Sequence, residues 1–441
     1  MTTVSPRLET TCPALILKAN RGVIHHGAVG IARSLGRLGV PVYAVVDDSY
    51  TPLATSRYIK KAFVWKNWPG DSAAFLVAIK KIADTIGSKS ILFPIDDLSA
   101  AFVTENASAL SQWFLIPNLP ENLPREFANK ANFYDLCTRV GIQTARSIVP
   151  RTIDDVRQFL ENATFPVVLK AAEQWFLIKG KYSTKIIQDR EQLFEFCKNF
   201  GEREYSKIIL QEYVPGEDWV YHGYCNHEKN LYVSFSGRKL LSFPLGAGAT
   251  VLGVSAMNSI LCRQSEKLLR ATAYSGIIDM DWRRDERDGQ YKIMDCNPRV
   301  GQNFRMFESE AGIDVVRAQH LDLGGHNIDC SPMIGGRLFI VEPFYFSALI
   351  HGWRRNASPS DAQRDPPPGK RELAWWCADD PLPALMMCVR LLLGVIGRTL
   401  RAPKAPAERG LAKPYRAPTG GLAGSAIPQA TLSSDPSINP P

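Results

Sequence analysis

Two strand-like stretches near residue 290, IIDMDW and YKIMDCN, flank a turn and carry acids in otherwise apolar text. The turn contains Asp288-Gly289, which is a strong signal for a β-hairpin. Side chains two residues apart share a face of a strand, so Asp295 and Asn297 point the same way. The hairpin places Asp281 within about one residue of the position opposite Asp295. The sequence therefore brings two carboxylates and one amide oxygen together.

Such a group of oxygen atoms suits a divalent cation. Magnesium takes one or two carboxylates from a protein and completes its shell with water and phosphate. The alternative is that the acids are solvated edge residues, but carboxylates packed together between apolar strands repel each other unless a cation is present. We therefore predict Asp281, Asp295 and Asn297 as ligands of Mg²⁺, with Mn²⁺ as the substitute ion.

A metal that works on phosphate also needs cationic and nucleotide-binding partners. Lys170 ends the apolar strand FPVVLK, where its ammonium can meet a phosphate as a point charge. Lys130 opens the helical stretch KANFYDLCTRVG, and Arg299 follows the hairpin. The strand IILQEYVPGED stops at Pro-Gly, so its backbone can pair with an adenine edge and its acids can bind a ribose. Taken singly, each of these features is as readily an ordinary surface residue or turn.

The elements that position these residues change character along the chain. Strands ALILKA, VPVYAVV and ILFPIDD alternate with helices GAVGIARSLGRLG and SAAFLVAIKKIADTIG, which predicts βαβ units and a parallel sheet. Only Gly27 and Gly30 keep part of the G-x-G-x-x-G spacing of a dinucleotide site, so that site is not expected. From Pro150 onward, helices mix with paired strands in an α+β pattern. The fold class is therefore α/β followed by α+β.

Composition and charge limit the class of protein. With 45% hydrophobic and 22% charged residues the chain is an ordinary globular protein. From His351 onward it has 12 Lys/Arg against 7 Asp/Glu, which is +5 of the total +8, so the body is nearly balanced and we expect no nucleic-acid partner. Nine scattered cysteines without a CxxC pair indicate reduced thiols, and no signal segment opens the chain. We predict a cytoplasmic protein.

The longest apolar run, ALMMCVRLLLGVIG (384–397), is shorter than the ~20 residues of a membrane-spanning helix and contains Arg390. We expect a helix packed on its own protein. A peripheral contact with a membrane or a protein through residues 371–401 is the alternative. Beyond residue 402 the text is mostly Pro, Ala, Gly and Ser, which predicts disorder.

In combination, the stretches NKANFYDLCTRVGIQTA, FPVVLKAA, IILQEYVPGEDWVYHGYCN, GRKLLSFPLGAGAT and SGIIDMDWRRDERDGQYKIMDCNPRVGQN resemble the ATP-grasp superfamily, in particular its carboxylate-amine ligase-like branch. The resemblance covers about residues 14–325. It implies an ATP-grasp fold with an N-terminal Rossmann-like pre-ATP-grasp domain. The expected parts are that domain at 1–124, an ATP-grasp domain of two α+β subdomains at 125–330, a C-terminal extension with an apolar helix at 331–401, and a disordered tail at 402–441.

The resemblance also implies roles for individual residues. Lys130 and Lys170 match the lysines that touch ATP phosphates, and Arg299 matches the arginine that stabilises the transferred group, so Arg299 and Lys170 are the expected catalytic residues. Asp281, Asp295 and Asn297 match the magnesium ligands. The remaining matches contact adenine and ribose, with the ribose acid left between the last two: Gln211, Glu212, Tyr213, Val214, Glu217 and Asp218.

The implied activity is an ATP- and Mg²⁺-dependent ligase that activates a carboxylate as an acyl phosphate for attack by an amine. Its partners would be small-molecule carboxylates and amines. Two departures from the family pattern favour an alternative. Both metal carboxylates are Asp where Glu is usual at the second position, and the segment after Lys170 is poor in glycine. The alternative is a nucleotide-binding regulatory or scaffold protein with this fold and without ligase turnover.

Overall fold

Of the 441 residues, the computed structural model describes 8, 10–20, 25–66, 71–173, 178–179, 183–243, 248–347 and 370–400. Residues 1–400 form one structural unit. The tail predicted for 402–441 lies outside the described residues. The structure can therefore be compared with the three parts predicted at 1–124, 125–330 and 331–401.

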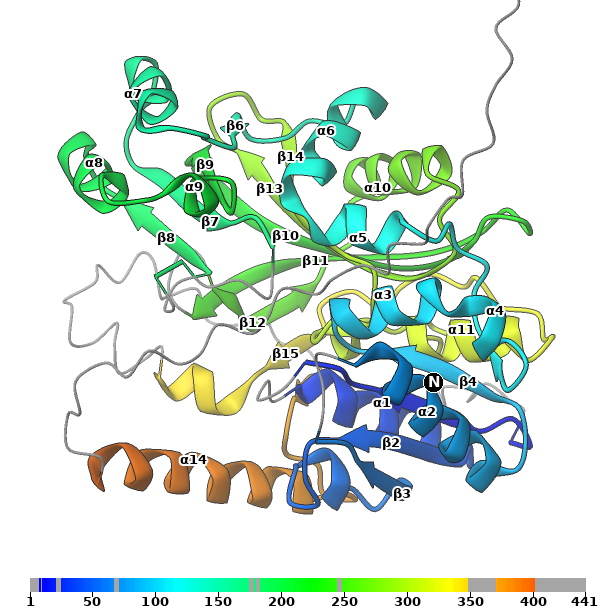
Figure 1. The fold of residues 1–441 in the computed structure, drawn as a ribbon. Coiled ribbons are helices and arrows are strands. Elements are labelled where there is room, and N and C mark those ends of the chain that lie inside the picture. The colour runs from blue at the N-terminus through cyan, green and yellow to red at the C-terminus, as the bar shows by residue number, and fades with distance from the viewer. Residues whose placement is uncertain are drawn as a thin grey trace, which may run out of the picture. The chain divides into compact units, whose positions relative to one another are not determined.

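The N-terminal part is built on a five-stranded parallel sheet in the order β3-β2-β1-β4-β5 (Figure 1). Along β1, Ala14 and Ile16 pack into one hydrophobic cluster, while Leu15 and Leu17 pack into another. A sheet buried on both faces reads as continuous apolar sequence, so the βαβ prediction is confirmed. The elements are β1 (Ala14–Leu17), α1 (His26–Gly36), β2 (Val42–Val46), β3 (Ile59–Val64), α2 (Ser72–Ile86), β4 (Ser90–Pro94), α3 (Asp97–Glu105), α4 (Ala107–Leu110) and β5 (Phe114–Leu115).

A smaller sheet follows, with four antiparallel strands in the order β6-β9-β7-β8. Two short helices lead into it, and α6 ends before Gly141 as the sequence predicts. The buried apolar residues of α7 and α8 pack against the strands in one cluster. The elements are α5 (Leu123–Ala128), α6 (Lys130–Val140), β6 (Ser147–Ile148), α7 (Ile153–Glu161), β7 (Val167–Ala171), β8 (Thr184–Ile187), α8 (Arg190–Cys197), α9 (Glu202–Tyr205) and β9 (Ile208–Glu212).

The largest sheet has seven strands in the order β14-β13-β10-β11-β12-β15-β16. Its last two strands come from the predicted C-terminal extension, so residues beyond 330 complete the sheet of the preceding part. The sequence did not single out β12, because GAGAT reads as a loop. The elements are β10 (Gly216–Asn226), β11 (Leu231–Phe243), β12 (Ala249–Ser255), α10 (Ser259–Ala271), β13 (Gly276–Asp285), β14 (Tyr291–Asn297), α11 (Val315–Leu323), β15 (Leu338–Ile340), β16 (Arg371–Leu373) and α14 (Leu382–Leu400).

The two faces of this sheet differ in chemistry. Met280, Trp282 and Cys296 point into an apolar cluster that also takes residues of α6 and α10. The alternate residues of the same strands are charged, because successive side chains of a strand point to opposite faces. The hairpin between β13 and β14 closes as predicted, with Gly289 at a φ of 72° that favours glycine in the turn. Strand alternation therefore gathers the charged side chains on one face.

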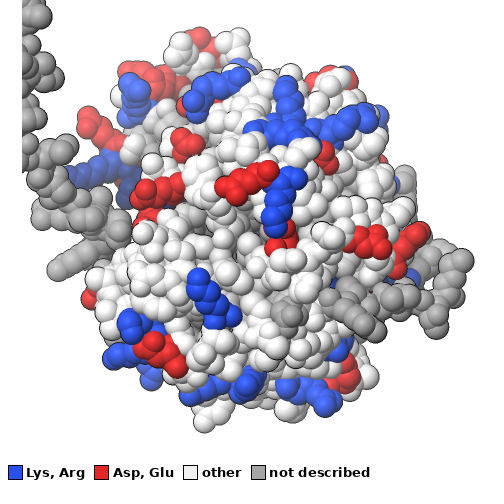
Figure 2. Space-filling view, turned by 90° about the vertical axis from the view of Figure 1, so that its right-hand side faces the viewer, with Lys and Arg blue, Asp and Glu red and all other residues white. Residues whose placement is uncertain are grey.

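The C-terminal helix α14 runs beside η1 (Leu53–Thr55) of the N-terminal part (Figure 1). Across the described residues, none of the helices is long and apolar enough to cross a bilayer. All nine cysteines lie among the described residues, and none of them forms a disulfide there. Figure 2 shows Lys and Arg interspersed with Asp and Glu on one face of the molecule, which is the pattern of an ordinary solvated surface.

Candidate active site

A cavity with about 760 Å³ of empty space lies between the four-stranded and seven-stranded sheets. Both sheets and the start of α6 contribute side chains to it. The residues that line it are Lys130, Val168, Lys170, Thr184, Gln211, Tyr213, Val214, Asp218, Lys239, Gly248, Asp281, Trp282, Arg283, Met294 and Asp295. Most of the residues predicted for ATP and magnesium are thus brought together, although they are spread over more than 160 positions of sequence.

The two predicted metal carboxylates face each other. Asp281 on β13 pairs directly with Asp295 on β14 in the antiparallel register. Burial raises the pKa of Asp281, and the Lys239 ammonium offsets this only in part. Burial acts in the same direction on Asp295, but the charge and hydrogen bonds of Lys130 outweigh it, so the pKa of Asp295 is lowered. Both groups are therefore held as a close pair whose ionisation depends on nearby cations.

Two lysines supply that positive charge. Lys130 Nζ donates to Asp295 Oδ1 at 2.7 Å and to Oδ2 at 2.8 Å. Lys239 Nζ lies 2.7 Å from Asp281 Oδ1. Burial acts to lower the pKa of each lysine, but the aspartates overcome it and raise both. Sequence reasoning missed Lys239 as a site residue. Its place on β11, which pairs with β10, is set by strand pairing that only the fold reveals.

Lys170 is the least compensated cation of the cavity. Its Nζ lies 3.4 Å from both the Tyr134 hydroxyl and the Met294 carbonyl oxygen. Burial, followed by the charge of Lys130, lowers the pKa of Lys170 to about 8. An ammonium held this way gains from an anion that enters the cavity, because the anion replaces missing solvation. The predicted phosphate contact therefore fits the position of Lys170.

The predicted adenine segment enters the cavity at the end of β9. Gln211, Tyr213 and Val214 line it, and Gln211 is fully buried. The Gln211 amide faces the Tyr134 hydroxyl, yet neither Oε1 nor Nε2 completes a hydrogen bond of good geometry among the described residues. The side chain of Glu212 points elsewhere: its Oε1 accepts from the Arg146 backbone at 2.9 Å.

Strand alternation separates the two candidates for the ribose acid. Asp218 lines the cavity and pairs with Arg283, with Arg283 Nε 3.1 Å from Asp218 Oδ1. Glu217 points to the other face of β10, where its Oε1 accepts from Arg238 Nη2 at 2.7 Å. Successive side chains of a strand point to opposite faces, and of these two acids Asp218 lines the cavity while Glu217 does not. Asp218 is therefore the candidate ribose acid.

Asn297 and Arg299 lie in a neighbouring cluster and are not among the residues that line the cavity. Arg299 Nη1 donates to Asp279 Oδ2 at 2.8 Å, and Asn297 Nδ2 lies 3.4 Å from the same oxygen. Arg299 Nε is 3.6 Å from Asp97 Oδ1, which comes from the start of α3 in the N-terminal part. Arg299 is thus placed between carboxylates of two parts of the chain.

His222 and Gly301 complete this cluster. The buried His222 places Nε2 3.2 Å from Asp279 Oδ1. A Cβ at Gly301 would lie 2.2 Å from His222 Cε1, so only glycine lets the backbone approach this closely. The sequence carried a signal for Asp279 that we did not use, because its spacing of two from Asp281 puts both on one face. His222 and Asp97 had no comparable signal.

The donor set fits a magnesium ion that is shared with phosphate. Across the described residues, no group of three or more His, Cys, Asp or Glu side chains is spaced to hold a metal by itself. Asp281 and Asp295 supply two opposed carboxylates, which is the usual protein share for Mg²⁺ bound with a nucleotide. Asn297 Nδ2 lies 3.4 Å from Asp279 Oδ2, and Asn297 is not among the residues that line the cavity, so its role as a ligand stays a prediction.

Comparison with known proteins places the fold. No protein-family model matches the chain. The chain is 25% identical over 308 residues to a D-aspartate ligase of Enterococcus faecium (strain Aus0004), covering 65% of this chain and 72% of that protein. N5-carboxyaminoimidazole synthetase from Staphylococcus aureus superposes with a TM-score of 0.55 at 13% identity, covering 75% of this chain and 82% of the other. An L-amino acid ligase from Bacillus licheniformis gives 0.52 at 15% identity, covering 71% and 75%.

These similar structures share the ATP-grasp fold. The chain has the ATP-grasp fold. The prediction of this fold is confirmed. The cavity predicted to bind the nucleotide lies between the two sheets of the predicted ATP-grasp domain, and the five-stranded sheet corresponds to the predicted Rossmann-like N-terminal part. The individual site residues stay predictions, now supported by their common cavity.

Proposed function

We propose that this ATP-grasp protein is an ATP- and Mg²⁺-dependent ligase that activates a carboxylate as an acyl phosphate and joins it to an amine. One observation carries the proposal. The opposed carboxylates of Asp281 and Asp295 share a single cavity with the ammonium groups of Lys130, Lys170 and Lys239. Phosphoryl transfer needs this combination, because its catalysis consists of positioning and charge stabilisation without a protein nucleophile.

ATP would occupy the cavity with its adenine at the end of β9 and its phosphates among the lysines. Gln211 offers a buried amide to the base, and Asp218 accepts from the ribose. Lys130 and Lys170 contact phosphate oxygens. Asp281 and Asp295 would hold Mg²⁺, which when bound draws charge from the phosphate oxygens. The residues of this chain thereby bind, orient and shield the triphosphate.

The substrate carboxylate then attacks the γ-phosphorus, the bond to the β-phosphate oxygen breaks, and ADP leaves. The acyl phosphate that results is attacked by the amine nitrogen, phosphate departs, and the amine loses one proton. Arg299 lies in the neighbouring cluster, where Asp279 orients its guanidinium. From there Arg299 would stabilise the negative charge that develops on the transferred phosphoryl group. Each step conserves charge and atoms with ATP, a carboxylate and an amine alone.

The comparisons support the ligase over the alternative of a scaffold without turnover, for which they offer nothing. Because the relative from E. faecium is named for D-aspartate, an acidic amino acid is the first carboxylate to test. The amine is left open. The cytoplasmic location stays a prediction, and we also retain the peripheral contact proposed for residues 371–401.

The test uses hydroxylamine, a small amine that captures any acyl phosphate as a hydroxamate. The purified chain is incubated with ATP, Mg²⁺ and a panel of amino acids beginning with D- and L-aspartate, and ADP and hydroxamate are measured together. We expect both products with at least one carboxylate, and loss of both in Lys170→Ala. Lys80→Ala is the matched control, because Lys80 pairs with Asp84 on an exposed surface. Nucleotide binding without ADP release across the panel would favour the scaffold.

A further inference from the structure

The segment that leads into α14 is anchored by buried charge. Arg33 of α1 donates from Nη2 to the Trp375 carbonyl oxygen at 2.7 Å and to the Asp380 carbonyl oxygen at 2.8 Å. Its Nε reaches Asp380 Oδ2 at 3.0 Å. Next to it, Arg37 Nε donates to Asp379 Oδ2 at 2.9 Å. The start of α14 is therefore fixed to the N-terminal part of the molecule.

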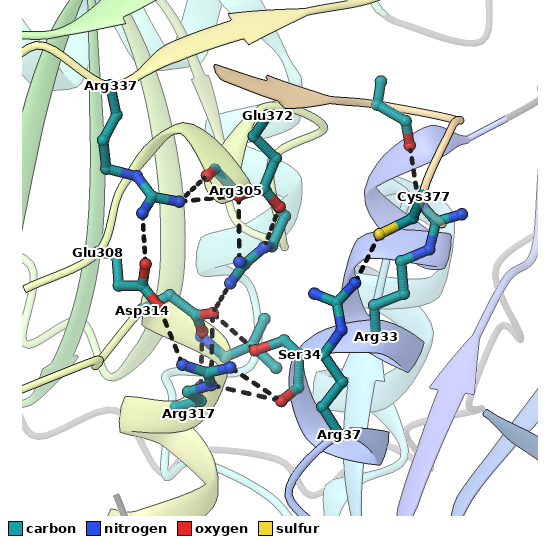
Figure 3. Close-up of polar contacts among 12 residues, drawn as sticks. Arg33, Ser34, Arg37, Arg305, Glu308, Asp314, Arg317, Arg337, Glu372 and Cys377 are labelled. Carbon is teal, nitrogen blue, oxygen red and sulfur yellow. Dashed lines mark hydrogen bonds and ion pairs between the residues drawn. The ribbon is translucent and has the colours of Figure 1, made fainter. Parts of the chain in front are cut away.

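A second group of charges holds β16 in place (Figure 3). Glu372 accepts from Arg305 Nε at 2.7 Å and from Arg337 Nη2 at 2.8 Å. Arg305 also donates to Asp314 at 2.7 Å. Figure 3 shows the Arg305 group on one side and the Arg33 and Arg37 side chains on α1 on the other. Ion pairs therefore hold the chain in place both at β16 and at the start of α14.

One side of α14 packs on the protein. Met387 is buried, and Ala384 packs against the same hydrophobic cluster as the N-terminal sheet. Arg390 Nη1 donates to Asp48 Oδ1 at 3.0 Å and to the Tyr50 carbonyl oxygen at 3.1 Å. The sequence-based expectation of a helix packed on its own protein thus describes this side.

The opposite side is an apolar stripe open to solvent. Leu382, Leu385, Val389 and Leu392 follow one another at intervals of three and four residues, which places them on one helix face. Their exposed fractions are 52%, 61%, 39% and 63%, and the neighbouring Leu393 is 61% exposed. Monomeric proteins rarely leave this many large apolar side chains together in water. The stripe is therefore a candidate binding surface.

The charges that follow the stripe in the sequence indicate which occupant. Residues 382–400 contain no acid, and Arg390 is engaged by Asp48 on the packed side. The sequence from 391 to 416 has six further cations against the single acid Glu408: Arg398, Arg401, Lys404, Arg409, Lys413 and Arg416. Apolar side chains together with a basic sequence match the acyl chains and headgroups of an anionic bilayer. A typical protein partner would need acids placed to meet these cations.

We propose that the stripe of α14 (Leu382, Leu385, Val389, Leu392 and Leu393) docks this protein on an anionic phospholipid surface, with the basic sequence after it contacting the headgroups. The helix would lie in the plane of the interface, since none of the helices among the described residues is long and apolar enough to cross a bilayer. Docking would bring the ligase to substrates or products that are held at a membrane. This surface is separate from the nucleotide cavity, so it can be tested without any substrate.

The test is co-sedimentation of the full chain with phosphatidylglycerol-phosphatidylcholine vesicles and with phosphatidylcholine vesicles. We expect binding to the anionic vesicles that weakens as salt screens the charges. The double variant Leu385→Glu/Leu392→Glu should bind at least about 10-fold more weakly, because it places two anions in the acyl region. Val77→Glu is the matched control, since Val77 is 56% exposed on α2, away from the stripe.

Three results would overturn the proposal. The first is a wild-type chain that stays in the supernatant at low salt. The second is vesicle binding that the double variant keeps in full. The third is a wild-type chain that is dimeric in light scattering and a double variant that is monomeric. This result would assign the stripe to contact with a second copy of the chain. An unchanged thermal shift with an ATP analogue and Mg²⁺ verifies that each variant is folded.

Discussion

Asp281 and Asp295 lie directly opposite each other on β13 and β14, and each is paired with a lysine from a different element. Lys130 comes from α6 and Lys239 from β11. The two lysines neutralise the carboxylates that we propose as magnesium ligands. Entry of Mg²⁺ with a nucleotide would release both ammonium groups toward the phosphates, so the same four charges serve the free and the bound site.

Replacing Asp295 should separate these roles. Asp295→Asn keeps the size of the side chain but removes the charge that pairs with Lys130 and the proposed metal. We expect ADP release to fall by about 10²-fold or more, the usual effect of removing a preorganised electrostatic contact. A steady-state assay of ADP release against Mg²⁺ concentration measures this. Glu217→Gln is the control, because Glu217 pairs with Arg238 outside the cavity. Full turnover by Asp295→Asn would refute its assignment.

Binding of ATP should take up protons near pH 8. Burial and the charge of Lys130 lower the pKa of Lys170 to about 8, so part of the protein carries a neutral amine at that pH. Triphosphate would favour the ammonium and raise this pKa, so affinity should decline as pH rises through 8. Calorimetry of an ATP analogue in buffers of different ionisation enthalpy measures the proton uptake. Lys170→Arg should abolish it, because a guanidinium stays charged.

Sequence alone could give most of the elements up to β14 and the pairing of Asp281 with Asp295, since both follow from local rules. Period-two alternation and the Asp288-Gly289 turn place Asp281 against Asp295 within one residue, and the structure puts them in direct register. The same alternation decides between Glu217 and Asp218 once the paired strands are known. These predictions succeed because strand geometry is fixed over short distances.

The rest depends on contacts between distant segments. Asp97 reaches Arg299 across the boundary between the N-terminal part and the large sheet, 202 positions later in the sequence. Lys239 faces Asp281 only because β10 lies between their strands. Spacing within one stretch carries no information on such contacts. Strand alternation predicts only the face on which a side chain lies. It therefore could not predict that the Asn297 side chain points toward Asp279.

Asp97 should lower the stability of the folded protein while it supports catalysis. Burial raises its pKa from 3.8 to about 6, and neither carboxylate oxygen has a hydrogen bond among the described residues. The folded state therefore holds the proton more tightly than the unfolded state. Stability falls as pH rises from about 4 to 6, and the full cost of about 3 kcal/mol is present above pH 6.

Asp97→Asn removes this cost. At pH 7.5 the variant should melt at the same or a higher temperature than the wild type, and the difference should shrink at pH 5. Arg299 loses one of its two orienting carboxylates, so kcat should fall about 10- to 100-fold with little change in KM for ATP. Melting curves at both pH values and ADP-release kinetics check this. The exposed Asp84→Asn should alter neither, and a large rise in KM for ATP would contradict a positioning role.

The Arg33–Asp380 pair should be the strongest single anchor of the C-terminal segment. Only 6% of the Arg33 side chain and 1% of the Asp380 side chain are exposed. Arg33→Met leaves the Asp380 carboxylate buried, with the Ser56 hydroxyl and the Arg57 backbone amide as its hydrogen-bond donors among the described residues, so the free energy of unfolding should fall by about 3–5 kcal/mol. Arg33→Met/Asp380→Asn should recover part of the loss, because no unpaired charge remains. Lys80→Met, in an exposed pair, should shift stability by less than about 1 kcal/mol. Thermal and urea unfolding of the four chains tests this, and equal effects of Arg33→Met and Lys80→Met would show that α14 is held by other contacts.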